Sequence, residues 1–207
     1  MNDDDLFMKA FKFTDKNYDR FTPGPTAMRK IEYIAPNYRM NELQGAVALA
    51  QLDRLEGICT RRNALGDALT DGIKDLPGIY TPKVHEGGKS SYWFYMFRIN
   101  EKEAGVSREE FCKALEAEGI PNSPGYIPTC VYEYDLFVNK EAYLGTNCPF
   151  DCKYYGREIS YYKGMCPTAK EILNTAVRIS ISEFYTDEDV NDIIKAIRKV
   201  SDYFKTI

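Results

Sequence analysis

The chain has 207 residues, 44% of them hydrophobic and 28% charged, so it is long enough to bury a core without disulfides or a metal. Its net charge of −4, with lysine and arginine scattered, argues against a nucleic-acid surface. The acidic start differs from a signal peptide, and no apolar run approaches the length of a membrane span. We therefore expect a cytoplasmic protein that binds neither nucleic acid nor membrane.

Two helices are expected first, one short and one long. Residues 3–13 are predicted to be helical, with three aspartates at the positive end of the helix. Residues 14–36 form a connection that is unusually long for a compact domain. Asn41 and Gln44 make a variant of the capping box, and apolar residues then recur at helical spacing up to a Leu-Pro-Gly breaker. One long helix over residues 41–76, packed along its apolar positions, follows from this pattern.

The remaining elements predict a small sheet covered by helices. Residues 91–99 are apolar on both faces, which is typical of a buried central strand, and residues 175–182 alternate as a half-buried strand does. Capping boxes at Ser107 and Thr186 begin two more helices, and Gly119 ends the first of them. This order of elements indicates the α/β fold class.

A long loop over residues 124–166 is rich in tyrosine, proline, glycine and cysteine. Loops of this length are usually lids, binding surfaces or disordered segments. Its aromatic residues are too dense for disorder, and its basic residues are too sparse for stacking single-stranded nucleic acid. We expect it to cover a ligand or to contact another subunit.

The cysteines and the single histidine narrow the chemistry. The six cysteines are Cys59, Cys112, Cys130, Cys148, Cys152 and Cys166. Without a secretion signal they are expected to be reduced, and the spacing from Cys148 to Cys166 lacks the tight pairs of a zinc site, so no metal is expected. Only His85 is available for a hydrolase triad, and no phosphate-binding fingerprint occurs.

The triplet Asn37-Tyr38-Arg39 stands just before the long helix, and apolar packing does not explain it. The stretch NYRMNELQGAVALAQLDRL, which begins with this triplet, closely resembles a segment of the DegT/DnrJ/StrS family. Members of that family are pyridoxal-phosphate-dependent aminotransferases of fold type I that act on keto-sugars and cyclitols. The resemblance continues through KALEAEGIPNSPGYIP and FYTDEDVNDIIKAIRKV and covers nearly the whole chain.

The resemblance implies a domain organisation. Residues 1–40 would be a remnant of the large cofactor-binding domain, and residues 41–76 would be a connecting helix. Residues 77–207 would form the small C-terminal α/β domain, with a mostly antiparallel sheet packed with helices. The intact protein would be a homodimer.

The resemblance also implies roles for individual residues. Asn37 would reach the cofactor phosphate of the other subunit, where an amide binds an anion without a competing charge. Arg39 and Tyr38 would lie near the substrate, because a guanidinium grips carboxylate or phosphate with two hydrogen bonds. The alternative is that Arg39 only bridges nearby carboxylates. Tyr126 matches the family's Tyr-x-Pro loop at the substrate, and Cys130 stands where many members have histidine.

No catalytic residue can be assigned from the resemblance. In the family, the Schiff-base lysine lies upstream of the position that matches Met1, as do the partners of the cofactor ring. The implied function is thus the C-terminal portion of an aminotransferase that moves an amino group from glutamate or glutamine to a keto-sugar or cyclitol. By itself this portion would be inactive and would bind pyridoxal phosphate weakly or not at all. The alternative is a non-catalytic binding or regulatory module derived from the family.

Overall fold

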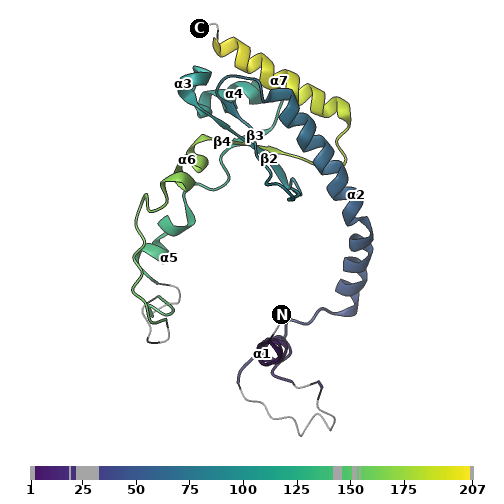
Figure 1. Ribbon diagram of the computed structural model, residues 1–207, viewed down its shortest axis with the longest axis vertical. Coiled ribbons are helices and arrows are strands. Elements are labelled where there is room, and N and C mark those ends of the chain that lie inside the picture. The colour runs from purple at the N-terminus through teal and green to yellow at the C-terminus, as the bar shows by residue number, and fades with distance from the viewer. Residues whose placement is uncertain are drawn as a thin grey trace. The chain divides into compact units, whose positions relative to one another are not determined.

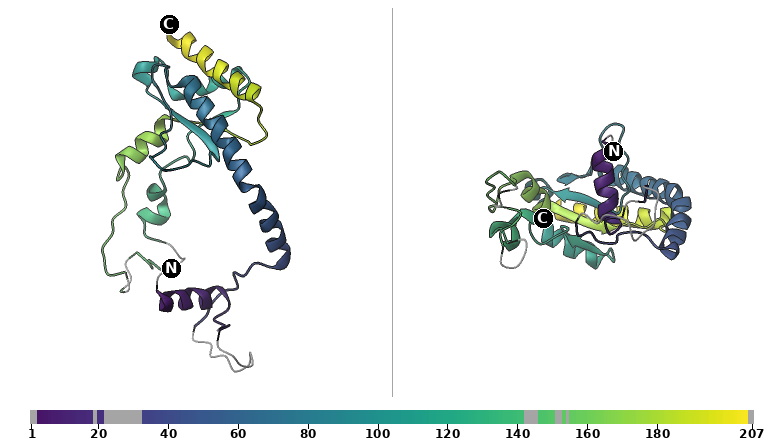
Figure 2. Two further views of the ribbon diagram at one scale, coloured as in Figure 1. Left: turned by 45° about the vertical axis from the view of Figure 1, so that its right-hand side comes forward. Right: turned by 90° about the horizontal axis from the view of Figure 1, so that it is seen from below.

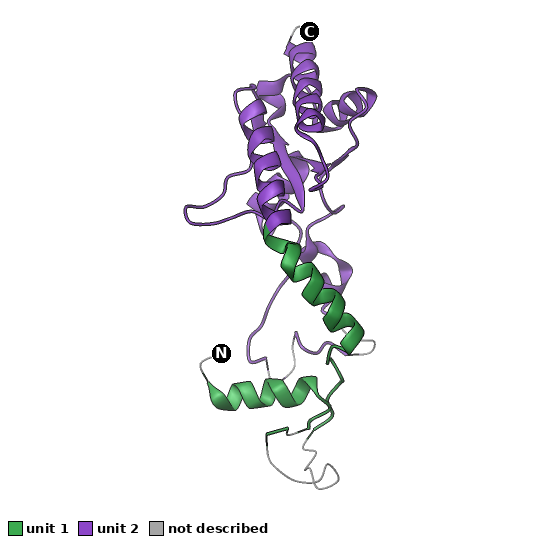
Figure 3. Ribbon diagram, turned by 90° about the vertical axis from the view of Figure 1, so that its right-hand side faces the viewer, with its two compact units in different colours: residues 1–56 green, residues 57–207 purple. Residues whose placement is uncertain are grey.

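The computed structural model (Figure 1) describes residues 3–18, 20–21, 33–141, 146–150, 153 and 155–205. The chain divides into two units, Met1–Glu56 and Gly57–Ile207, which Figure 3 distinguishes by colour. Among the described residues, no helix combines the length and the apolar character that crossing a membrane requires.

The first unit begins with helix α1, Asp4–Thr14, as the sequence predicts. The Asp3 side chain caps it by accepting a hydrogen bond from the Leu6 amide at 2.8 Å. After the helix, the chain pairs with the segment that precedes the next helix, through an antiparallel bridge between Asp15 and Asn37. This bridge ties together two ends of a connection whose middle lies outside the described residues.

The long helix α2, Glu42–Ile73, confirms the helix expected from the sequence. Its capping box is formed in both directions: the Asn41 amide donates to Gln44 Oε1 at 3.0 Å, and the Gln44 amide donates to Asn41 Oδ1 at 2.9 Å. The expected packing holds only for the later half of the helix. Leu43 is 81% exposed, whereas Leu69 is fully buried, because the later turns lie against the sheet of the second unit.

The second unit contains a four-stranded antiparallel sheet with the order β1-β2-β4-β3. The strands are β1 (Ile79–Tyr80), β2 (Phe94–Ile99), β3 (Asn122–Pro124) and β4 (Ala176–Ser180). The two longer strands are central, as the sequence predicts, and their register places Tyr95 opposite Ile179 and Phe97 opposite Val177. Directly opposite residues share one face of a sheet, so these four side chains form one apolar surface.

Helices cover the two faces of the sheet unequally. The helices of the second unit are α3 (Glu101–Ala104), α4 (Arg108–Ala117), α5 (Asp135–Val138), α6 (Pro167–Thr175) and α7 (Asp187–Lys205). Helices α4 and α7 and the end of α2 share the buried core with one face of the sheet, and α6 lies on β2 (Figures 1 and 2). Phe94, Met96 and Arg98 on the second face are only half-buried, so β2 is fully buried on one face rather than on both.

The predicted capping boxes of α4 and α7 are present. Ser107 Oγ accepts from the Glu110 amide at 3.3 Å, and Thr186 Oγ1 accepts from the Asp189 amide at 3.1 Å. The fold class expected from the sequence, an α/β unit with a small antiparallel sheet preceded by a long helix, is therefore confirmed.

The expected long loop contains helical turns. A 3-10 turn, Val131–Glu133, leads into α5, and α6 begins directly after the segment. The rings of Phe137, Phe150 and Tyr161 pack together with centroid distances of 5.4 to 5.9 Å. Cys152 lies outside the described residues.

Candidate functional site

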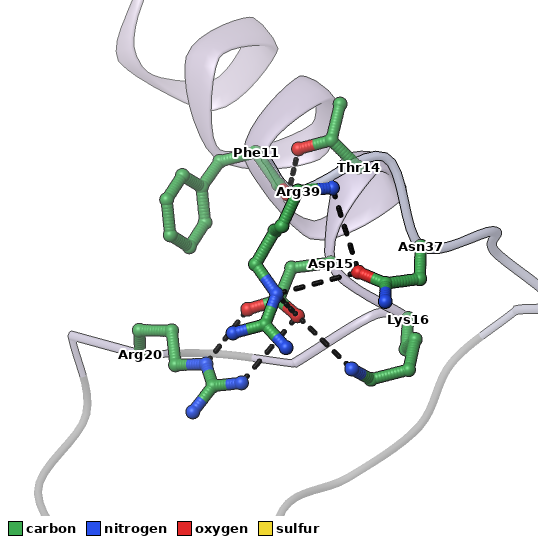
Figure 4. Close-up of polar contacts among 7 residues, drawn as sticks. All are labelled: Phe11, Thr14, Asp15, Lys16, Arg20, Asn37 and Arg39. Carbon is green, nitrogen blue, oxygen red and sulfur yellow. Dashed lines mark hydrogen bonds and ion pairs between the residues drawn. The ribbon is translucent and has the colours of Figure 1, made fainter. Parts of the chain in front are cut away.

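The bridge in the first unit places the predicted triplet against the end of α1. The Lys16 amide donates to the Pro36 carbonyl, and the Tyr38 amide donates to the Thr14 carbonyl, each at 2.9 Å. Side chains alternate along an extended segment. Asn37 therefore lies on the same side as its bridge partner Asp15, and Arg39, two residues on, joins them (Figure 4).

Asp15 is the buried centre of this cluster, with a side chain that is only 3% exposed. Its carboxylate pairs with Arg20 Nε at 2.7 Å, with Arg39 Nε at 2.9 Å and with Lys16 Nζ at 3.6 Å. The hydrogen bond from Arg20 is the largest cause that lowers the pKa of Asp15; burial acts in the opposite direction, and the charges of all three cations add to the lowering. A buried carboxylate needs such partners to remain ionised.

Arg39 and Asn37 are joined to each other as well as to the cluster. Asn37 Oδ1 accepts from the Arg39 amide at 3.4 Å and from Arg39 Nε at 3.3 Å. Within the described residues, no partner is found for Asn37 Nδ2 or for the Arg39 Nη groups. Both side chains are exposed, Arg39 by 49%. The sequence left open whether Arg39 bridges a carboxylate, and in this structure it does.

Tyr38 points away from the acidic centre. Its ring lies edge-on to Phe13 with a centroid distance of 6.4 Å, and it remains 71% exposed. The exposed Tyr38 ring and the exposed Arg39 guanidinium are adjacent in the chain. This short segment therefore presents an aromatic face and several hydrogen-bond donors.

Tyr126 belongs to the second unit and has its own set of neighbours. Its ring stacks on Phe94 at 5.3 Å and meets Trp93 edge-on at 6.0 Å. The Arg178 guanidinium carbon lies 5.7 Å from the Tyr126 ring centroid, within the range of a cation–π contact. The ring also lines an apolar cavity of about 440 Å³ together with buried Cys130. The Tyr126 side chain is thus held from several sides but is still 47% exposed.

The residues that contact Arg39 and Tyr126 could not be identified from the sequence. Asp15 comes from an irregular stretch and pairs with Arg39, more than twenty positions away, while Arg20 acts only through its pair with Asp15. Phe94 and Arg178 likewise meet Tyr126 only through the sheet. The one available signal was Asp15 itself, a charged residue shortly after the predicted helix over residues 3–13.

The donor set fits one part of a pyridoxal phosphate site. The Asn37 amide is a neutral donor suited to a phosphate oxygen, and the cationic groups around it favour an anion. This is a fit to the phosphate alone. Among the described residues, no group of three or more histidine, cysteine, aspartate or glutamate side chains could hold a metal ion.

The fold is shared with aminotransferases. The solved structure of DesV from S. venezuelae superimposes with a TM-score of 0.72 over 97% of this chain and 45% of that one, at 18% identity. Residues 1–160 match the model of the DegT/DnrJ/EryC1/StrS aminotransferase family. The chain belongs to this family, as its sequence suggested.

Two curated relatives illustrate the range of that family. The spore coat polysaccharide biosynthesis protein SpsC of Bacillus subtilis (strain 168) is 28% identical over 82% of this chain and 39% of its own length. An aminotransferase of Micromonospora echinospora, named for L-glutamine and 3-amino-2,3-dideoxy-scyllo-inosose, is 28% identical over 89% of this chain and 42% of its own length. The chain therefore spans less than half the length of these relatives.

Proposed function

We propose that this chain is the C-terminal portion of a pyridoxal-phosphate-dependent aminotransferase that moves an amino group from glutamate or glutamine to a keto-sugar or cyclitol. In this proposal residues 1–40 belong to the large domain, residues 41–76 connect, and residues 77–207 form the small domain. The intact protein would be a cytoplasmic homodimer. Membership of the family and the names of the relatives support the reaction class.

One observation carries the proposal: Asn37 and Arg39 are hydrogen-bonded to each other (Figure 4), both side chains are exposed, and their remaining donors have no partner among the described residues. Exposed side chains ordinarily leave such donors to water, and a bound ligand can take the place of that water. Here the inward contacts use Asn37 Oδ1 and Arg39 Nε, and the other donors remain for a bound molecule.

Each residue has a defined task in the proposed site. Asn37 Nδ2 donates a hydrogen bond to a phosphate oxygen of the cofactor. The Arg39 Nη groups bind a carboxylate or phosphate of the substrate with two parallel hydrogen bonds. Tyr38 and Tyr126 orient the substrate with a ring face and a hydroxyl group. Pyridoxal phosphate, when bound, supplies the electron sink for amino-group transfer.

Transamination requires a lysine for proton transfer, and we assign that role to no lysine of this sequence. A lysine that bonds to the cofactor normally also carries the proton. None of the lysines in this sequence matches the lysine motif of the family. The chain alone is therefore expected to hold phosphate weakly and to have no transaminase activity.

A borohydride experiment tests the proposal. The purified chain is mixed with pyridoxal phosphate, reduced, and mapped by peptide mass spectrometry. We expect scattered, substoichiometric labelling of lysines. A stoichiometric adduct at one lysine would show that the chain contains its own catalytic lysine and would contradict the proposal.

A second measurement separates the proposal from the alternative of a non-catalytic module. Binding of pyridoxal phosphate is compared with binding of pyridoxal, which lacks the phosphate, for the wild-type chain and for Asn37→Ala. Preference for the phosphorylated form should be lost in Asn37→Ala and kept in the control Asn139→Ala, which is remote in sequence. Equal binding of both compounds by the wild-type chain would favour the alternative.

A further inference from the structure

Asp15 is buried and its backbone is held on two sides. It follows the last turn of α1, where its amide donates to the Lys12 carbonyl at 3.3 Å, and its carbonyl accepts from the Tyr18 amide at 2.8 Å. The bridge to Asn37 holds it from the other side. A carboxylate at a helix C-terminus faces the negative end of the helix dipole, so the position is electrostatically unfavourable without cations.

The positive charge around Asp15 exceeds the negative charge of its carboxylate. The positive charges of Lys16, Arg20 and Arg39 face one negative charge, so these four groups together keep a net charge of +2. The cluster is therefore attractive to an anion even after its internal ion pairs have formed. A phosphate group, with up to two negative charges, suits such a surplus.

The contact with Asp15 sets the direction of the Arg39 side chain. A half-exposed arginine has several rotamers, and confining it costs conformational entropy. The ion pair at Arg39 Nε favours one orientation of the side chain (Figure 4), and among the described residues no hydrogen bond from the Nη groups is found.

Arg39 in turn sets the direction of the Asn37 amide. Two donors of Arg39, the backbone amide and Nε, point at Asn37, so an acceptor must face them. Asn37 Oδ1 is the acceptor of that side chain, and Nδ2 is therefore turned outward. Reversing the amide would place its NH2 group against two other donors.

We propose that Asp15 is the positioning residue of this site: by holding Arg39 Nε, it orients both Arg39 and the Asn37 amide so that they present free donors to a phosphate group. This inference rests on the proposed function and extends it, because it assigns the alignment of the two donors to a residue outside the Asn-Tyr-Arg triplet. Asp15 itself does not touch the ligand.

The test uses the full 207-residue chain and inorganic phosphate. The side-chain NMR signals of Asn37 Nδ2 and Arg39 Nε are followed during a phosphate titration at constant ionic strength. The variants are Asp15→Asn, which removes the charge with little change in size, and Asp15→Glu, which keeps it. Asp75→Asn, which removes the carboxylate paired with Arg198 in the second unit, is the matched control.

A positioning role and a simple charge effect predict opposite changes in the phosphate affinity of Asp15→Asn. Asp15→Asn makes the cluster more positive, so charge alone predicts tighter phosphate binding. The positioning role predicts binding that is roughly three- to tenfold weaker, together with loss of the Arg39 Nε shift that is typical of an ion pair. Asp15→Glu should restore part of the affinity, and Asp75→Asn should change nothing. Equal or tighter binding by Asp15→Asn would overturn the inference.

A double-mutant cycle covers the case in which Asp15→Asn disturbs folding. Arg39→Lys keeps the positive charge but has no Nε to join Asp15 with Asn37, so it should weaken phosphate binding while Asp15 is intact. If Asp15 acts through Arg39, then adding Asp15→Asn or Asp15→Glu to Arg39→Lys should have little further effect. Fully additive effects would contradict positioning through Arg39.

The two proposals fail in different ways. If the wild-type Asn37 signal does not respond to phosphate, the phosphate-binding role in the proposed function is wrong, and the inference falls with it. If the wild type responds and Asp15→Asn responds equally, only the role of Asp15 is wrong.

Discussion

Glu133 and Lys170 lie 2.7 Å apart, between Oε2 and Nζ, and join two segments that are 37 residues apart in sequence. The Glu133 side chain is only 4% exposed and also accepts hydrogen bonds from the Thr129 hydroxyl and, at 3.1 Å, from the Gly164 amide. The Glu133 carboxylate thus joins the beginning of the loop over residues 124–166 to Gly164 near its end and to Lys170 in α6.

This contact predicts a pH dependence of stability. The hydrogen bond from Lys170, followed by those from Thr129 and Gly164, lowers the pKa of Glu133 to about 2. In the unfolded chain a glutamate has a pKa of about 4.3, so between those two values the unfolded chain binds more protons and stability rises with pH. The contribution is fully present above about pH 4.3 and is lost as the pH falls through about 2.

The variant Glu133→Gln tests that dependence. The free energy of unfolding, measured by denaturant titration from pH 2 to pH 6, should rise less steeply with pH in the variant than in the wild type. Asp192→Asn, which breaks an exposed pair with Lys195, is the control and should leave the slope unchanged. Equal slopes for Glu133→Gln and the wild type would show that this carboxylate does not couple folding to protonation.

Asn41 is predicted to hold the first turn of α2. Replacing it by alanine removes one half of the capping box with Gln44, at a cost of about 1 kcal/mol in helix stability. Amide hydrogen exchange in the first turn should become faster, while exchange near Leu69 should not change. Gln51→Ala, at an exposed position within the same helix, is the control. Unchanged protection in Asn41→Ala would argue against the cap.

A side chain at position 66 is predicted to destabilise the protein. A Cβ at this buried position would lie 2.6 Å from atoms of the Tyr92 ring, which is too close for any real contact. Gly66→Ala should therefore lower the free energy of unfolding by about 1–3 kcal/mol, because the ring must move. Gly57→Ala, in the same helix with no atom within 4 Å of the new Cβ, should instead raise it by about 0.5–1 kcal/mol. Thermal unfolding of both variants measures the contrast, and two changes of the same sign would contradict it.

Tyr126 is predicted to contribute to stability as well as to the proposed substrate site. Tyr126→Ala removes the stacking on Phe94 and the contact with Arg178, so the second unit should lose about 1–2 kcal/mol. Tyr162→Ala, at a tyrosine that is 59% exposed, is the matched control and should have little effect. If both variants unfold at the same denaturant concentration, the stacked arrangement is not stabilising.

Local signals accounted for most of the elements. The capping pairs at Asn41, Ser107 and Thr186 each join residues three positions apart, so a reader of the sequence can locate them. Helix α6 was missed because it is only nine residues long and has none of these side-chain caps; Pro167 at its start was the one available signal. Its place in the fold depends on contacts with β2.

The amino-acid sequence by itself determined the α/β class, the long helix and the family, because these depend on periodicity, caps and the motif that begins at Asn37. Only the tertiary structure decided what the motif contacts. Arg39 forms an ion pair with Asp15, and Tyr126 contacts Phe94 and Arg178. These contacts join segments that are far apart in the chain. Such pairings depend on burial and on the satisfaction of charge in three dimensions, which spacing along the chain does not record.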